Sequence, residues 1–230
     1  MKPVSKIQKI PKQPLAVAAY ETIIKKIICL EYQPSQHLEE NLLVEELGIG
    51  RTPVREALVR LQSEKMVESH PNKGVIVRPI TLQNTKAMFE SMHIFEFGVV
   101  DIAVKKDCSP FILRLKQANN TVKKAILSNK VFHLVEANHD FHINFARCSQ
   151  NEFLIRGVED VRKEAKRLSY LSYNNAIDPG RPLESHYNAV VKEHEKMINA
   201  LADKDEKRLK RLLLEHIETF RQRIILFMTS

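Results

Sequence analysis

The segment that most constrains the fold runs from Leu47 to Leu61 and reads LGIGRTPVREALVRL. Four of its apolar residues recur at i, i+3, i+4 and i+7, a spacing that places them on one face of a helix. These residues are Val54, Ala57, Leu58 and Leu61. Thr52 is the expected N-cap, and Pro53 suits the first helical position, where a missing N–H costs nothing. The segment therefore predicts a turn followed by a helix over residues 52–65.

Two arginines, Arg51 and Arg55, stand at the start of this expected helix and point away from its apolar face. The second helix of a helix-turn-helix presents its N-terminal end to the major groove of DNA, where such side chains contact base edges. The pattern therefore predicts a recognition helix. A surface helix with two solvated arginines is the alternative that this segment alone leaves open.

The sequence around this helix supplies the rest of a winged helix-turn-helix. Apolar spacing predicts two earlier helices, and two short apolar runs joined by Pro-Asn-Lys-Gly predict a hairpin. The helices are expected over residues 15–30 and 40–47, and the strands over 66–70 and 75–77. We expect a DNA-binding domain over residues 14–79, preceded by a basic arm over residues 1–13. The hairpin, or wing, would bring Lys73 and the backbone of Gly74 close to the minor groove or flanking phosphates.

The remainder of the chain, residues 80–230, is predicted to be helical almost throughout. Six helices are expected, over residues 82–106, 110–128, 131–148, 152–173, 183–202 and 205–227. Short polar breaks separate them, which favours an antiparallel helical bundle. The fold class is therefore mostly α, with an N-terminal winged helix-turn-helix followed by an all-α domain.

Composition and cysteine spacing limit the cellular compartment and the binding partners that can be expected. The formal net charge is +8, which favours an anionic partner such as nucleic acid. Three cysteines at unrelated spacings form neither a disulfide framework nor a CxxC metal motif, which fits a reduced compartment. The N-terminus lacks the apolar core of a signal peptide, and no apolar run is long enough to span a bilayer. We therefore expect a cytoplasmic, nucleoid-associated protein.

Polar side chains interrupt three apolar stripes of the expected bundle. Asn138 and His142 are four residues apart on one helix face, and His194 and His216 lie within the stripes of the last two helices. At about 1.5 Å per residue, His194 and His216 lie about 13 Å and about 17 Å from the turn between those helices, which is nearly the same depth. Neutral imidazole suits Zn, Ni, Cu or Fe, with Zn, Ni or a similar ion expected here, and an amide oxygen can complete the set of ligands. The pattern predicts a divalent metal site inside the bundle.

Another interpretation of these histidines stays open. A single buried histidine is more often a hydrogen-bonded core residue than a ligand, although a polar ring buried without a partner costs about 1–3 kcal/mol. A metalloenzyme would need a general base near the metal. Glu193 precedes His194 but is expected to point elsewhere, because successive residues are about 100° apart around a helix. No HExxH motif frames the site.

These motifs resemble the GntR superfamily of bacterial transcription regulators, on the segment GRTPVREAL and the wing residues. The helical remainder resembles the FadR branch, which carries the ligand-binding domain called FCD, on FHINFARCSQN at residues 141–151 and the pair Glu193-His194. The resemblance covers residues 14–227. It implies that the residues in contact with DNA are Arg51, Thr52, Arg55, Lys73 and Gly74.

The resemblance also implies a metal shell of one aspartate and three histidines, which correspond here to Asn138, His142, His194 and His216. Asparagine at the aspartate position removes one negative charge and should weaken divalent binding, although an amide oxygen remains a competent ligand. The family implies a homodimer on a pseudo-palindromic operator, controlled by a small effector that is commonly a carboxylate. We expect a repressor of this kind.

Three further residues are candidates for effector contact. His93 occupies the position at which the family tends to carry an arginine, three residues before a glutamate, here Glu96. His186 lies two turns before His194, and Arg223 lies two turns after His216. Two alternatives to the metal-dependent regulator remain. The first is a regulator without metal whose histidines contact the ligand directly, and the second, more remote, is a helical-bundle metalloenzyme.

Overall fold

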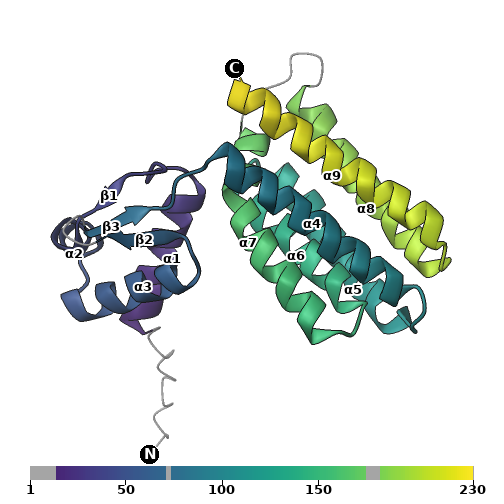
Figure 1. Ribbon diagram of the computed structural model, residues 1–230, viewed down its shortest axis with the longest axis horizontal. Coiled ribbons are helices and arrows are strands. Elements are labelled where there is room, and N and C mark those ends of the chain that lie inside the picture. Colours follow the sequence, from purple (N-terminus) through teal and green to yellow (C-terminus); the bar gives the residue numbers. More distant parts are fainter. Residues whose placement is uncertain (1–13, 71–73, 175–181, 230) are drawn as a thin grey trace, which may run out of the picture. The chain divides into compact units, whose positions relative to one another are not determined.

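A computed structural model describes residues 14–70, 74–174 and 182–229 of the chain (Figure 1). The chain divides into two compact units. The first comprises the described residues up to Ile27 together with Tyr32–Arg78, and the second comprises Ile28–Glu31 and the described residues from Pro79 onward. Lys73 and the basic arm over residues 1–13 lie outside the described residues.

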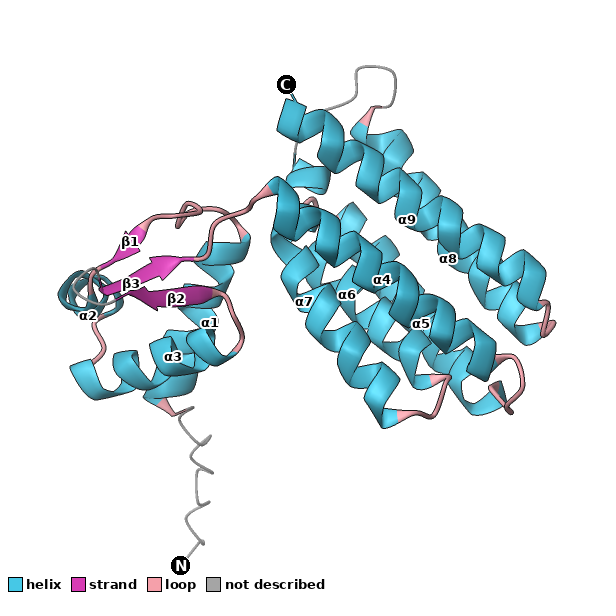
Figure 2. Ribbon diagram, in the orientation of Figure 1, coloured by secondary structure: helices cyan, strands magenta, loops and turns pink. Residues whose placement is uncertain are grey.

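The first unit has the order of elements of a winged helix-turn-helix, as predicted. Its helices are α1 (Leu15–Ile28), α2 (Glu40–Leu47) and α3 (Arg51–Ser63), and its strands are β1 (His37–Leu38), β2 (Val67–His70) and β3 (Gly74–Val77). The strands form an antiparallel sheet in the order β1-β3-β2 (Figure 2). Strand β2 pairs with β3 in the predicted hairpin, in a register that sets Val67 opposite Val77.

Strand β1 was not predicted, because a two-residue strand has no periodicity to detect. It contributes Leu38, which is buried, to the core of the unit. The four apolar residues that were predicted to form the buried face of α3 are all buried, so this prediction is confirmed. They pack with apolar residues of α1, of the sheet and of the bend before β2, which are Ala19, Ile23, Ile27, Met66, Val67 and Val77.

The start of α3 differs from the prediction. The helix begins at Arg51, and its N-cap is Gly50 rather than Thr52. Gly50 adopts the extended backbone conformation of an N-cap, with φ −60° and ψ 162°, so Pro53 occupies the third helical position instead of the first. Proline is tolerated there because the first-turn N–H groups have no partner within the helix. Gly48 ends α2 with φ 62°, a left-handed conformation that favours glycine.

The second unit contains six helices within the described residues, close to the predicted ranges. They are α4 (Leu82–Ala103), α5 (Ser109–Leu127), α6 (Val131–Arg147), α7 (Glu152–Asn174), α8 (Leu183–Ala202) and α9 (Glu206–Thr229). Thr81 caps α4, since its side-chain oxygen accepts a hydrogen bond from the N–H of Asn84 at 3.1 Å. None of the helices in the described ranges is both long and apolar enough to cross a membrane.

The helices of the second unit pack as a bundle whose centre is polar. Helix α6 packs against α5 and α7, while α4 packs against α7 and α9, and α8 packs against α5 and α9 (Figure 1). Large apolar side chains such as Phe141, Leu115 and Met197 fill most of the interior. Several polar residues are buried with them, and most face one region between α4, α6, α7, α8 and α9. These are Glu96, Asn138, His142, Arg162, Ser172, His186, His194, His216 and Arg223.

Candidate metal centre and DNA-binding surface

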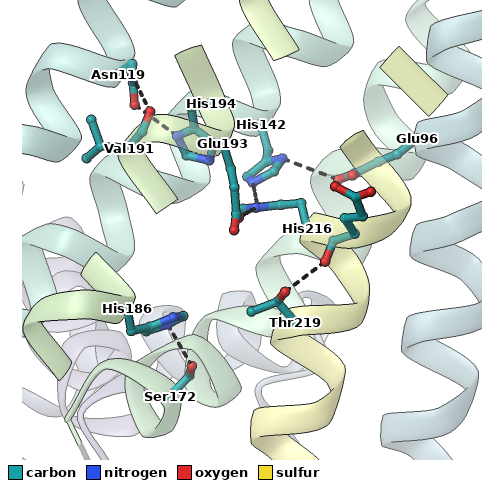
Figure 3. Close-up of polar contacts among 11 residues, drawn as sticks. Glu96, Asn119, His142, Ser172, His186, Val191, Glu193, His194, His216 and Thr219 are labelled. Atoms are coloured by element: carbon teal, nitrogen blue, oxygen red, sulfur yellow. Dashed lines mark hydrogen bonds and ion pairs between the residues drawn. The ribbon is translucent and has the colours of Figure 1, made fainter. Parts of the chain in front are cut away.

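Three imidazoles from different helices meet inside the second unit, as the sequence predicted (Figure 3). His142 comes from α6, His194 from α8 and His216 from α9, and all three are buried. One ring nitrogen of each lies within 4.8 Å of the corresponding nitrogen of the other two. The Nε2 atoms of His142 and His216 are 3.2 Å apart. This spacing allows all three nitrogens to bind one ion after small side-chain adjustments.

The opposite ring nitrogen of each histidine faces an oxygen atom. The Nδ1 of His194 lies 3.0 Å from Oδ1 of Asn119, and the Nδ1 of His216 lies 2.7 Å from a carboxylate oxygen of Glu193. The Nδ1 of His142 lies 3.6 Å from a carboxylate oxygen of Glu96. Metal-binding histidines usually have the arrangement seen at His194 and His216, in which an oxygen acceptor fixes the ring orientation and tautomer, whereas the 3.6 Å contact of His142 is too long for a hydrogen bond.

The hydrogen-bond pattern indicates which nitrogen of each ring carries the proton. The Nδ2 of Asn119 donates to the carbonyl oxygen of Val191, so its Oδ1 faces His194 as an acceptor. A carboxylate such as that of Glu193 accepts hydrogen bonds only. The protons of His194 and His216 therefore belong on Nδ1, and the lone pairs on Nε2 face the centre of the cluster.

Two buried acceptor atoms have no hydrogen-bond partner among the described residues. They are Nε2 of His194 and Oδ1 of Asn138, and Asn138 lies one helical turn before His142 and lines the adjoining cavity with His216. Burying such an atom without a partner costs about 1–3 kcal/mol. A divalent cation at the centre of the cluster would bind the lone pair of His194. The donor atoms present therefore fit a metal that prefers imidazole ligands.

Burial also keeps two of these rings, those of His142 and His194, in the neutral form that binds metal. Burial lowers the pKa of His142 well below its usual value, and the positive charge of Arg162 lowers it further. Burial likewise lowers the pKa of His194, with a further contribution from His216. Both imidazoles are therefore neutral near pH 7, and their lone pairs are available to a cation.

A buried ion pair lies on the α4 side of the cluster. Glu96 is 1% exposed, and one of its carboxylate oxygens accepts a hydrogen bond from Nε of Arg162 while facing His142. This carboxylate lies on the Nδ1 side of His142, away from the centre on which the Nε2 atoms converge. Arg162 in turn neutralises Glu96, so that neither charge is buried alone.

A small cavity adjoins the cluster, and it is lined by His186, one of the three predicted effector residues, and by Ser172, the partner of another, Arg223. Its volume is about 20 Å³, which is enough for about one water molecule. Polar residues around it include Asn138, Arg162, Ser172, His186, Glu193 and His216. Nε of Arg223 donates to Oγ of Ser172 at 3.0 Å, and a ring nitrogen of His186 lies 3.5 Å from the same oxygen. Arg223 and His186 are thus brought together at Ser172.

His93 lies elsewhere. Its side chain is exposed, stacks on the ring of Phe97 at 4.0 Å between ring centroids, and lines a surface groove between α4 and α9. Residues three apart on a helix differ by about 60° in direction, and here the edge of the buried face falls between them. Glu96 therefore enters the core while His93 remains on the surface.

The outer partners of the histidines were the part of the site that the sequence did not reveal. The expectation that Glu193 points elsewhere was wrong, because its long side chain reaches from the flank of α8 to His216 on α9. Asn119 and Arg162 gave no signal beyond being polar residues on amphipathic helices. Their roles depend on how α5 and α7 pack against neighbouring helices. The spacing of residues along a single helix does not predict such contacts.

The candidate DNA-binding residues of the first unit lie at the start of α3. The side chains of Arg51 and Arg55 are 61% and 63% exposed, and both form ion pairs with Glu40 of α2. Their Nε atoms lie 3.2 Å and 2.7 Å from the two carboxylate oxygens of Glu40. Arg51 also donates to Oδ1 of Asn41 at 2.8 Å. Thr52 is exposed beside them. The two guanidinium groups are thus held together at the accessible end of α3.

Gly74 begins β3 at the end of the wing hairpin and has φ 71°. A Cβ atom at this position would lie 2.8 Å from Nε2 of His37 on β1. The left-handed backbone therefore favours glycine, whereas the contact with the tip of the partly exposed His37 ring could be relieved by movement of that side chain.

Two family models match the chain in its two units. Residues 15–77 match "Bacterial regulatory proteins, gntR family", and residues 87–219 match "FCD domain". The chain belongs to the GntR family, in the group that carries an FCD domain. It is therefore a DNA-binding transcriptional regulator rather than an enzyme.

Curated relatives of the regulator agree with this assignment. An "Uxu operon regulator" of Haemophilus influenzae is 28% identical over 206 residues, which cover 80% of this chain and 72% of the relative. The "Nta operon transcriptional regulator" of Aminobacter aminovorans is 25% identical, with 83% and 85% of the two chains covered. The "HTH-type transcriptional repressor RspR" of Escherichia coli is 20% identical, with 90% and 88% covered.

Solved structures show that the fold is shared. The structure titled "E. coli McbR/YncC" superimposes with a TM-score of 0.73 at 19% identity and covers 94% of this chain and 99% of the other. A regulator from Rhodococcus sp. RHA1 superimposes with a TM-score of 0.70 at 19% identity, and 91% and 97% of the two chains are covered. Both matches extend over the two units of the regulator.

Proposed function

We propose that the FCD unit of this regulator binds a divalent ion such as Zn or Ni through His142, His194 and His216, with Asn138 as a further ligand. The observation that carries the proposal is the arrangement of three buried imidazoles, each with Nδ1 toward an oxygen and Nε2 toward a common centre. The two buried lone pairs without a partner, on His194 and Asn138, support the same conclusion.

The effector in this proposal is a small carboxylate. A bound divalent ion supplies positive charge and an open coordination position for one carboxylate oxygen. Arg162 and Arg223 provide guanidinium groups beside the cavity, and such groups bind carboxylates with two parallel hydrogen bonds. His186 contributes a polar ring at Ser172. His93 is not part of this set, because it lies on the groove between α4 and α9.

The DNA partner is a pseudo-palindromic operator bound by a homodimer. Arg51 and Arg55 would read base edges, Thr52 would contact phosphate, and Lys73 and Gly74 would contact the backbone beside the minor groove. Two of the relatives are named for operons and a third is named a repressor, which supports the proposal that this regulator represses an operon. The cavity has room for about one water molecule in this structure, so it would have to widen to admit a carboxylate. This movement of the surrounding helices would then change affinity for the operator.

The test combines elemental analysis of untagged protein with DNA-binding measurements. Duplexes selected from randomised sequence supply the operator, and fluorescence anisotropy measures affinity with and without a panel of small carboxylic acids. We expect about one divalent ion per chain, bound by imidazole ligands, and at least one acid that changes operator affinity in the metal-loaded protein only. If chelated protein responds to the same acid equally, the histidines contact the ligand directly and the metal proposal is wrong.

A change at Asn138 tests the fourth ligand. Asn138→Asp adds a negative charge next to a divalent cation, so we expect affinity for the ion to rise by about tenfold or more. Competition against a chromophoric chelator measures this change. Asn144→Asp, also on α6 but bonded to the helix backbone at Asp140, is the matched control for net charge. Equal affinities in the two variants would show that Asn138 is not a ligand.

A further inference from the structure

His142 and His216 form a direct contact inside the second unit, and this contact requires a proton (Figure 3). Their Nε2 atoms lie 3.2 Å apart, which is a hydrogen-bond distance. Two lone pairs at this separation would repel each other, so one of the two nitrogens carries a hydrogen atom. Both rings are buried, so this bond is not replaced by bonds to bulk water.

The contact on the other side of His216 assigns this proton to His142. The Nδ1 of His216 lies 2.7 Å from a carboxylate oxygen of Glu193, which accepts hydrogen bonds only. The single proton of a neutral His216 ring is therefore on Nδ1, and its Nε2 is an acceptor. His142 then donates from Nε2, which leaves a lone pair on its own Nδ1.

The distance between His142 and Glu96 agrees with this assignment. The Nδ1 of His142 is buried and has no hydrogen-bond partner among the described residues, although a carboxylate oxygen of Glu96 lies 3.6 Å away. An N–H group in this place would form a hydrogen bond of about 2.7–2.9 Å with the carboxylate. A lone pair and a carboxylate oxygen stay apart, as these two atoms do.

An ion at the cluster requires the other tautomer of His142. A neutral imidazole binds a metal through the lone pair of one nitrogen and keeps its proton on the other nitrogen. When Nε2 of His142 binds an ion, this nitrogen loses its proton and Nδ1 takes one up, so the ring stays neutral. Nδ1 then becomes a donor, and Glu96 is the acceptor that faces it.

Arg162 keeps Glu96 in place as an acceptor. The Nε of Arg162 donates to the same carboxylate oxygen that faces His142, and Glu96 and Arg162 are only 1% and 5% exposed. A carboxylate that is buried this deeply stays ionised when it is paired with a cation. Its second oxygen, Oε2, has no partner among the described residues, so the carboxylate can accept another hydrogen bond.

We propose that Glu96, held by Arg162, is a positioning residue that stabilises the metal-binding tautomer of His142. His142 donates to His216 in the metal-free protein and to Glu96 in the metal-loaded protein. This inference rests on the metal site of the proposed function and adds the residue that controls one of its ligands. Glu96 and Arg162 together carry no net charge, so the effect comes from the hydrogen-bond acceptor rather than from added negative charge.

Nitrogen NMR of the full chain, labelled with ¹⁵N in histidine only, measures the tautomers directly. The resonances of His142 and His216 are assigned by their loss in His142→Gln and His216→Gln. In metal-free protein we expect the proton of His142 on Nε2 and that of His216 on Nδ1. With stoichiometric Zn²⁺ the proton of His142 should be on Nδ1, while that of His216 should stay where it was.

A double variant removes the acceptor without leaving a buried charge alone. Glu96→Met/Arg162→Met replaces the ion pair with apolar side chains, a change that folded proteins often tolerate. We expect the affinity for Zn²⁺, measured by competition against a chromophoric chelator, to fall by about 10- to 100-fold. The matched control is Glu136→Met/Lys166→Met, which removes an ion pair of 2.8 Å between α6 and α7 and should keep the parental affinity.

Each outcome decides the proposal. The expected change of tautomer in the parent, with weaker zinc binding in the Glu96 variant alone, supports it. A proton on Nδ1 of His142 in metal-free protein, or protons on both nitrogens of His216, would overturn it and leave the metal site intact. Parental zinc affinity in the Glu96 variant, or an equal loss in the control, would also overturn it. If the Glu96 variant does not fold, the spectra of the parent decide. A parent that binds no zinc would overturn the metal site of the proposed function, and the role of Glu96 with it.

Discussion

The divalent ion proposed for the second unit should be lost from the purified regulator when His194 and His216 are both changed to alanine. The two substitutions remove two of three imidazoles that converge on one centre, and the remaining proposed ligands, His142 and Asn138, both come from α6. Two ligands on one helix do not hold a divalent ion as four converging ligands do. Elemental analysis of untagged protein should give about one ion per chain for the parent and close to none for the variant.

Thermal unfolding gives a second readout of the same change. An ion present at about 1,000 times its dissociation constant stabilises the folded state by about 4 kcal/mol, or about 10 °C in melting temperature for a domain of this size. A chelator should therefore lower the melting temperature of the parent by about this amount and leave that of the variant unchanged. A full ion complement in the variant would contradict the site.

The control for this experiment removes two histidines that lie outside the cluster. His70 on β2 and His133 on α6 are both exposed. A His70→Ala/His133→Ala variant changes the same number of imidazoles but should keep the ion and the response to chelator. Loss of the ion in this control would mean that the metal binds surface histidines instead.

Much of the fold could be predicted because the spacing of apolar residues along the chain indicates which face of each helix is buried. The stripes along α6, α8 and α9 were visible in the sequence, and so were the polar residues that interrupt them. The short turn between α8 and α9 fixed the depths of His194 and His216, so their meeting could be predicted from spacing alone.

What the sequence did not reveal depends on contacts between helices or on very short elements. Glu193 lies off the apolar stripe of α8 and reaches His216 only because α9 packs at that flank. Asn119 orients His194 from α5, which is 75 residues away along the chain. Strand β1 has two residues and no period, and Gly50 replaces Thr52 as the N-cap because its backbone, not its side chain, suits the position.

The second large effect is expected at the recognition helix. Arg55→Ala should weaken binding to the selected operator by about 5- to 150-fold, since a guanidinium that pairs with a guanine edge contributes about 1–3 kcal/mol of discrimination. Affinity for random duplex should fall much less, so the ratio of the affinity for operator to the affinity for random duplex should decrease. Anisotropy titrations with both duplexes at one fixed salt concentration measure this ratio.

A matched control separates base reading from net charge. Arg114 is an exposed arginine of α5 in the second unit, and Arg114→Ala removes the same charge. This control should leave the ratio of operator to random affinity at the parental value. If Arg55→Ala also leaves that ratio unchanged, Arg55 does not read bases, whatever happens to total affinity.

The ion pair with Glu40 makes the change at Arg55 informative. Glu40 binds the Nε atom of Arg55, which leaves both terminal nitrogens of the guanidinium available for the two acceptors of a guanine edge. In Arg55→Ala, Glu40 still pairs with Arg51 and is only 27% exposed, so no carboxylate is left without a counter-charge. The variant should therefore unfold at the parental temperature. A lost operator preference in a protein of unchanged stability then reports the contact with DNA itself.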